Sequence, residues 1–291
     1  MAEAATLDLS VIVTVDPEGD LGATVASLGV FANETAPHVQ VVVAHPADRE
    51  PDPQALADLR RYTRFQSVDV VAATDGDTTA AARNAGLAAA NGVWALLLCA
   101  GDELLCDPLP LVDRHPAATA ILFAHRLRRG KRDRRQAPPR ITSRNRLNRF
   151  TAANPVGPAA VLLRRAFLKY PFDRKLPHLD DWLFWLLNLA VFDRPVREPK
   201  VALTRTSHAA DQLDRRGFGE TREQIADRML RRLRFHLSRK QRHNLALQAA
   251  CGLKQQGRRA PFRTLLRFPC NPTLYVKRLS YFLMGRMAAS P

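Results

Sequence analysis

Residues 83–103 read RNAGLAAANGVWALLLCAGDE, and this stretch decides the fold. Its first part, residues 83–90, is rich in alanine and predicts a helix that ends at an Asn-Gly pair. The apolar run at residues 93–98 predicts a buried strand, which breaks into a small acidic turn at residues 99–103. Open α/β sheets bind their ligands at the carboxyl ends of strands, so this turn is a candidate ligand site.

The N-terminal half alternates between apolar runs and amphipathic segments, with turn residues between them. β-Branched residues dominate the runs, as in strands buried on both faces of a sheet. Strict alternation of strands and helices predicts right-handed crossovers and a parallel sheet. The expected strands are residues 7–15, 39–44, 68–73 and 93–98, and the expected helices are residues 21–32, 53–62 and 83–90.

The second half is less regular and more basic. Residues 126–149 hold eleven basic residues and two prolines with little apolar content, which predicts a surface loop. Further strands are expected at residues 117–124 and 156–163, and an edge strand at residues 196–203. Residues 178–190 form an amphipathic helix opened by acidic residues.

The net charge of +16 is unevenly distributed. Residues 1–125 carry a net charge of −11, residues 126–214 one of +12, and residues 215–291 one of +15. This pattern favours a polyanionic partner, either a membrane surface or a nucleic acid, over a purely solvated basic face. Nucleic acid is the weaker choice, because no known nucleic-acid-binding motif is present.

The four cysteines show no CxxC pairing, which favours a reduced, cytoplasmic protein. The sequence contains neither an apolar stretch of about 18 residues nor a signal-peptide pattern at its start, so we expect no membrane span. From residue 218 onward, Arg and Lys alternate with apolar residues at helical spacing. Such helices suit a membrane interface, or pack on the main domain or a second subunit.

The segment Ala82-Arg83-Asn84-Ala85-Gly86, together with the strand and acidic turn that follow it, resembles the core of family-two glycosyltransferases of the GT-A fold. The resemblance covers about residues 8–205. It implies a GT-A-like (Rossmann-like), mostly parallel sheet flanked by helices in residues 1–210, followed by a basic α-helical extension in residues 211–291.

The resemblance implies a donor site lined by Thr14, Asp16 and Arg83. Asp16 replaces the aromatic residue that is usual in the family, so base stacking is lost there. At the end of the second strand the acid that binds the base is absent, and His45 stands beside this position, as a nitrogen donor or as an ordinary loop residue.

The turn at residues 99–102 corresponds to the D-x-D metal motif of the family and keeps only its last carboxylate, Asp102. In one interpretation Asp102, with water and the donor's phosphates, holds Mg²⁺ or Mn²⁺, since Mg²⁺ often takes one or two protein carboxylates. In the other, arginines neutralise the diphosphate. His208 lies where some members place a late metal or phosphate contact.

Leu179-Asp180-Asp181-Trp182 resembles the catalytic segment of the family, which makes Asp181 the expected base and Asp180 its acidic neighbour. Adjacent carboxylates at a helix N-terminus also suit this role, because the dipole keeps them ionised while like charges push one pKa upward.

We therefore expect an inverting glycosyltransferase that moves a sugar from a nucleotide-sugar donor to a glycan or lipid-linked acceptor in cell-surface polysaccharide synthesis. The expected location is the cytoplasm, with peripheral binding at the inner face of the plasma membrane. The alternative is a degenerate GT-A-like domain that binds a partner or membrane without catalysis, and Ala44, Cys99 and Gly101 favour this alternative.

Overall fold

The computed structural model describes residues 7–15, 19–62, 64–74, 76–129, 132–138, 151, 161–176, 179–189, 195–206, 224–229 and, between 238 and 248, residues 238, 239, 241, 242, 244, 245 and 248. The predicted extension of residues 211–291 lies largely outside this set, although residues 224–229 are helical. None of the helices in the described part of the chain is both long and apolar enough to span a bilayer.

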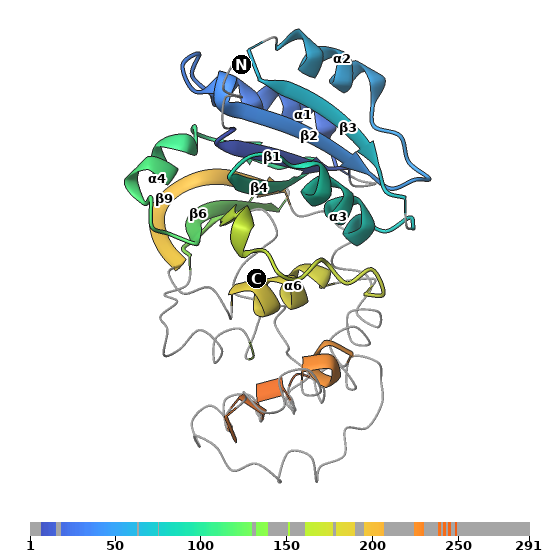
Figure 1. The fold of residues 1–291 in the computed structure, drawn as a ribbon, viewed down its shortest axis with the longest axis vertical. Coiled ribbons are helices and arrows are strands. Elements are labelled where there is room, and N and C mark those ends of the chain that lie inside the picture. Colours follow the sequence, from blue (N-terminus) through green and yellow to red (C-terminus); the bar gives the residue numbers. More distant parts are fainter. Residues whose placement is uncertain are drawn as a thin grey trace, which may run out of the picture.

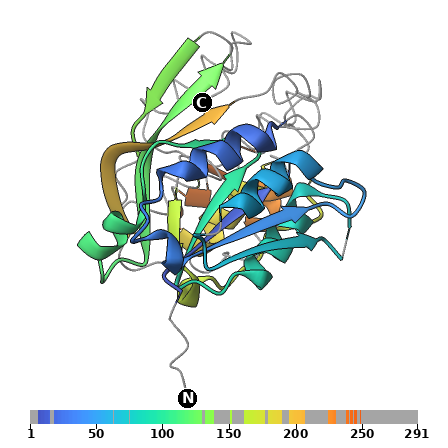
Figure 2. The same cartoon turned by 90° about the horizontal axis from the view of Figure 1, so that it is seen from above.

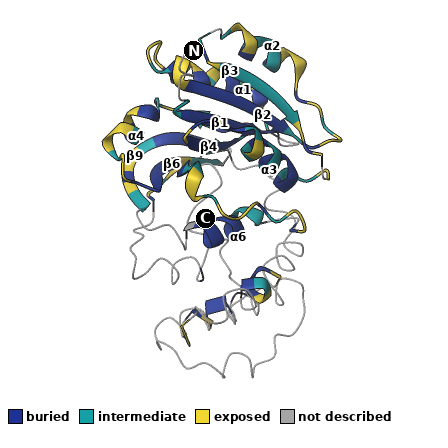
Figure 3. Ribbon diagram, in the orientation of Figure 1, coloured by how far each residue is buried: buried dark blue, intermediate teal, exposed yellow. Residues whose placement is uncertain are grey.

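The first half of the sheet is parallel, as predicted. Its strands lie in the order β3-β2-β1-β4, so the chain adds strands outward from β1 and then returns to its other side (Figure 1). The apolar residues of β1, β2 and β4 are buried on both faces, which explains why these strands are mostly apolar rather than alternating (Figure 3). The strands are β1 (Leu9–Thr14), β2 (Val39–His45), β3 (Ser67–Ala72) and β4 (Trp94–Cys99).

Helices cover both faces of this half. The face that contains Val11 and Val13 packs on α1 (Leu21–Ser27), η1 (Leu28–Val30) and α2 (Pro53–Arg61). The opposite face, which contains Ile12, packs on α3 (Thr79–Ala89) and α6 (Asp180–Leu189). Side chains cap three of these helices at their N-termini: Asp20 caps α1, Asp52 caps α2 and Thr78 caps α3.

The second half of the sheet is mixed. The strand β8 (Val161–Arg164) lies antiparallel between β4 and β6 (Ala120–Arg129). Beyond β6 the sheet curls through β9 (Pro195–Thr206), which runs parallel to β6, and ends at β5 (Glu103–Leu104) (Figure 1). The remaining elements are β7 (Arg132–Gln136), α4 (Leu109–Arg114), η2 (Ala36–His38) and η3 (Arg165–Phe167).

Two predictions for this half were wrong. Residues 126–129 and 132–136 were expected in a loop, but they form a hairpin in which β6 extends to Arg129 and pairs with β7 (Figure 2). Backbone pairing tolerates the basic residues because Arg126, Arg134 and Arg135 remain exposed. The strand expected at the edge is also internal, because β9 pairs with β6 on one side and with β5 on the other.

The central helix α3 lies very close to the sheet at Gly86. A Cβ atom at this position would lie 2.5 Å from Ile12 Cγ2 and 3.1 Å from Ala44 Cβ. Both neighbours are fully buried, and a β-branched side chain has little freedom to move away. A residue without a side chain is therefore required here.

Gly86→Ala is expected to lower the free energy of unfolding by about 1–3 kcal/mol, the usual cost of overpacking a core. Gly29→Ala is the matched control, because a Cβ atom at Gly29 meets nothing within 4 Å. Urea denaturation of the two variants measures the difference. Equal stability of both variants would show that α3 can move away from the sheet.

Candidate functional site

The turn that follows β4 is built from hydrogen bonds of its own. Asp102 Oδ2 accepts a hydrogen bond from the Cys99 N–H at 2.8 Å, and the Asp102 N–H donates to Cys99 O at 2.9 Å. Gly101 has a φ of 91°, in the left-handed region that favours glycine. Asp102 is buried, with an exposed fraction of 1%. One of its carboxylate oxygens therefore serves the turn itself.

The loop after β1 packs directly on this turn. The Gly101 N–H donates to Thr24 Oγ1 at 2.8 Å and to Asp20 O at 3.0 Å. A Cβ atom at Gly19 would lie 2.2 Å from Ala100 O, so only glycine allows this approach. The carboxyl ends of β1 and β4 thus form one rigid platform.

Arg83 connects this platform to α6. Its guanidinium is buried, with Nη1 2.6 Å from Asp180 Oδ2 and Nη2 3.5 Å from Cys99 Sγ. The guanidinium carbon also lies 5.3 Å from the centre of the Phe172 ring, a cation–π contact. A single side chain of α3 therefore contacts the turn after β4 and the start of α6.

Asn84 supports the same connection. Its side chain donates to Phe172 O at 2.9 Å and accepts from the Phe172 N–H at 2.8 Å, so both backbone groups of Phe172 are satisfied. Sequence reasoning quoted Asn84 within the family motif but gave it no role. The pattern contains no signal for the contact, because Phe172 is 88 residues away.

Asp180 and Asp181 form the first turn of α6. The preceding residue, Leu179, has a φ of 54°, a conformation that is strained for leucine and is typical of functional sites. Burial disfavours the charged form of Arg83, but the carboxylates of Asp180 and Asp181 raise the pKa of Arg83 above its usual value. The guanidinium therefore stays charged, and Asp181 lies near it while remaining partly exposed.

Two further ionisable groups, Cys99 and His125, are uncharged. Burial raises the pKa of the Cys99 thiol to about 11, although Arg83 and Arg205 act in the opposite direction, so the thiol is protonated at neutral pH. Burial, aided by the charge of Arg205, lowers the pKa of His125 to about 4, so this imidazole is neutral. His125 Nδ1 is buried without a hydrogen-bond partner among the described residues.

Thr14 ends β1 directly beside Cys99, its partner in the parallel register. Side chains alternate along a strand, so Thr14 shares the α3 face with Ile12, and Cys99 shares it with Leu97. The Thr14 hydroxyl is buried and has no hydrogen-bond partner within the described part of the chain. It is therefore an unsatisfied polar group at the carboxyl end of β1.

The structure thus brings five of the predicted site residues to one end of the sheet: Thr14, Arg83, Asp102, Asp180 and Asp181. Asp16 and His208 lie outside the described residues. His45 ends β2 and has its Nδ1 2.9 Å from Pro46 O, a local loop contact. The individual roles of all these residues remain predictions.

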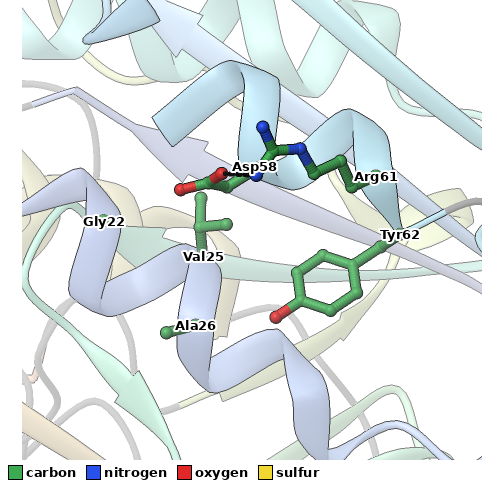
Figure 4. Close-up of a pocket in the computed structure, with 6 residues that line it drawn as sticks. All are labelled: Gly22, Val25, Ala26, Asp58, Arg61 and Tyr62. Carbon is green, nitrogen blue, oxygen red and sulfur yellow. Dashed lines mark hydrogen bonds and ion pairs between the residues drawn. The ribbon is translucent and has the colours of Figure 1, made fainter. Parts of the chain in front are cut away.

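A separate hollow lies between α1 and α2, on the other face of the sheet (Figure 4). Its floor includes Val25 and Tyr62, and its rim carries the exposed ion pair between Asp58 and Arg61, with an N–O distance of 2.9 Å. The hollow contains none of the predicted site residues.

The curled sheet, its flanking helices and the acidic turn at the end of β4 define the GT-A-like fold of glycosyltransferases. The chain is similar to the structure of S. aureus TarS 1–349 in complex with UDP-GlcNAc, with a TM-score of 0.59 and 19% identity over 96% of this chain and 81% of that one. It is similar to the mannosyltransferase PcManGT from Pyrobaculum calidifontis in complex with GDP-Man and Mn²⁺, with a TM-score of 0.59 and 15% identity over 98% and 82%.

The longer S. aureus TarS chain also matches, with a TM-score of 0.59 and 19% identity, and this chain spans 49% of its length. These likenesses establish the fold. No protein-family model matches the sequence, and no curated protein matches it.

The structure of PcManGT contains Mn²⁺, which raises the question of whether the turn here fits such an ion. Mg²⁺ and Mn²⁺ prefer oxygen ligands. This turn offers a protonated thiol at Cys99, no side-chain donor at Ala100 or Gly101, and an Asp102 carboxylate with one oxygen already bound to the turn. No group of three His, Cys, Asp or Glu residues arranged for a metal occurs in the described part of the chain. The described residues of the turn therefore do not fit a divalent cation.

Proposed function

We propose that this protein is an inverting glycosyltransferase that moves a sugar from a nucleotide-sugar donor to a hydroxyl of a glycan or lipid-linked acceptor. The observation that carries the proposal is the contact of Arg83 with both Cys99 and Asp180. Through it, a pair of carboxylates lies beside the carboxyl ends of β1 and β4, where α/β sheets bind nucleotides. The nucleotide-sugars in the TarS and PcManGT structures support the same class of donor.

Asp181 is the proposed general base. It is partly exposed, so an acceptor can reach it, and it directly follows Asp180, which binds the Arg83 guanidinium. Asp181 removes the hydroxyl proton as the acceptor oxygen attacks the anomeric carbon. The bond between this carbon and the diphosphate oxygen breaks, and the nucleoside diphosphate leaves with the electron pair. A single displacement of this kind inverts the configuration at the anomeric carbon.

The donor is proposed to lie over the platform formed by β1 and β4. Thr14, whose buried hydroxyl has no hydrogen-bond partner among the described residues, and Asp16, from the loop that follows β1, are proposed to contact the nucleoside. Residues 1–210 form the proposed catalytic domain. The basic residues 211–291 are proposed to bind an anionic membrane surface, which would bring the enzyme to lipid-linked acceptors of polysaccharide synthesis.

A second candidate function is binding without turnover. It is favoured by the loss of side-chain oxygens at Cys99 and Gly101, and by Ala44 in place of an acid at the end of β2. Such a domain would still fold around the Arg83 connection, but it would have no use for a partly exposed acid held just after a strained residue at the start of α6. The conformation of Leu179 therefore favours the enzyme.

The first experiment is calorimetry with UDP, GDP, CDP and dTDP, followed by transfer assays with sugars carried by the nucleotide that binds, for example UDP-GlcNAc or GDP-Man. One of the four nucleotides is expected to bind, and the corresponding nucleotide-sugar is expected to be consumed when an acceptor is added. Binding without any consumption, including the slow hydrolysis that water supports, would favour the non-catalytic alternative. Failure of all four nucleotides to bind would overturn the proposal.

A further inference from the structure

We infer that the donor's diphosphate is bound here without a divalent cation, and that Arg205, with Arg83 buried behind Cys99, supplies the positive charge at the turn after β4. This inference rests on the proposed function and states what holds the leaving group. It concerns an anion-binding site formed by the turn, the end of β9 and one residue of α3.

The ligand atoms of the turn give the first argument. Among residues 99–102 only Asp102 has side-chain oxygens, so the turn offers a metal at most one carboxylate. Its Oδ2 accepts the Cys99 N–H, and the residue is almost fully buried. The thiol at position 99 stands where the family motif has a carboxylate, and it offers no oxygen ligand to Mg²⁺ or Mn²⁺.

The arrangement of cations gives the second argument. Arg83 Nη2 lies 3.5 Å from Cys99 Sγ, so a fixed positive charge lies directly behind the atom that replaces a metal ligand. A divalent ion in front of this thiol would be repelled by that charge. The Asp180 carboxylate offsets the repulsion only in part, because it lies on the other side of the guanidinium, at Nη1.

Arg205 gives the third argument. The preceding residue, Thr204, pairs with Glu103, the residue that follows Asp102, so Arg205 lies beside the turn. Its charge acts on both Cys99 and His125. Among the described residues no ion pair engages Arg205, whereas Arg128 on the neighbouring strand is bound to Glu103 at 2.6 Å. A partly exposed guanidinium without a carboxylate partner is suited to a phosphate, which it can bind with two parallel hydrogen bonds.

The test uses the full chain and whichever of UDP, GDP, CDP and dTDP binds in calorimetry. Binding is measured in excess EDTA and again in excess MnCl₂, and the two dissociation constants are expected to agree. Binding that disappears in EDTA would overturn the inference while leaving the proposed function intact. Failure of every nucleotide under both conditions would overturn both.

The variant Arg205→Gln tests whether Arg205 itself binds the diphosphate, rather than the overall positive charge of the protein. It is expected to weaken binding of the nucleoside diphosphate by about 10- to 100-fold, the cost of losing a hydrogen bond to a charged group. Binding of the matching nucleoside monophosphate should weaken less. The control is Arg126→Gln, an exposed arginine whose β6 position pairs with Thr204, and it should leave binding unchanged. Equal losses in the two variants would overturn the assignment of Arg205.

The variant Cys99→Asp tests whether a carboxylate at residue 99 creates a metal site in the turn. The added carboxylate would supply the missing ligand and offset Arg83, so nucleotide binding is expected to become stronger with MnCl₂ than with EDTA. Cys99→Ser has nearly the same volume but adds no charge, and it should stay insensitive to metal. If Cys99→Ser also binds more tightly with MnCl₂, an oxygen at residue 99 is enough to form a metal site and the inference is wrong. This comparison retains its meaning if Cys99→Asp does not fold.

Discussion

Asp181→Asn is expected to lower the rate of sugar transfer by about 10²- to 10⁴-fold, the usual contribution of a positioned general base. The amide has nearly the same shape as the carboxylate but does not accept the proton of the acceptor hydroxyl. The dissociation constant for the nucleotide-sugar should stay nearly constant, because Asp181 acts on the acceptor. Single-turnover transfer assays and calorimetry on the same variant measure the two quantities.

The informative comparison is Asp180→Asn. This variant keeps Asp181 but weakens the contact with Arg83. It is therefore expected to be less stable than the unmodified protein but to keep the pH dependence of transfer. A base mechanism also predicts that the ascending limb of the pH–rate profile is absent in Asp181→Asn. If donor binding and transfer fall by the same factor in Asp181→Asn, its role is in binding and the assignment as base is wrong.

Arg83→Met is expected to lower the free energy of unfolding by about 3–5 kcal/mol, because removal of one partner leaves a largely buried carboxylate at Asp180 without its counter-charge. The contacts with Cys99 and with the Phe172 ring are lost at the same time. Methionine keeps most of the apolar volume, so the loss reports on charge and hydrogen bonding. Urea denaturation monitored by circular dichroism measures it.

The matched control is Arg61→Met, which breaks the exposed ion pair with Asp58 on α2. Exposed pairs contribute about 0–1 kcal/mol, so this change should be small. The double variant Arg83→Met with Asp180→Leu should recover part of the lost stability, because the unpaired carboxylate is gone. If the double variant loses as much free energy of unfolding as the two single variants lose together, or more, the ion pair does not explain the effect.

The sequence predicted the first half of the fold well because the information there is local. The apolar runs of β1, β2 and β4 are buried on both faces, and α1, α2 and α3 each have their own N-terminal cap. The hairpin of β6 and β7 was missed because the backbone holds the two strands together, whereas an arginine-rich sequence is typical of a surface loop. The short β5 was missed because two residues carry no periodicity.

The site was predictable only in part. The pair at Asp180 and Asp181 was found from its resemblance to a known segment and from its place at a helix start. The contact of Arg83 with Asp180 spans 97 positions, and the pattern of residues contains no signal for it. The position of Arg205 beside the turn depends on the register of β9 with β5, which follows from how the sheet curls.

The insertion of β8 between β4 and β6 has a consequence for synthesis on the ribosome. Strands β1 to β4 and their helices are contiguous in sequence, so they can pack as soon as about the first hundred residues have emerged. The strand that completes the edge of β4 is made some sixty residues later, and β9 about thirty residues after that. During this interval the growing chain exposes the unpaired backbone edge of β4. A chaperone that binds nascent chains would therefore find its target in the interval between the emergence of β4 and that of β8.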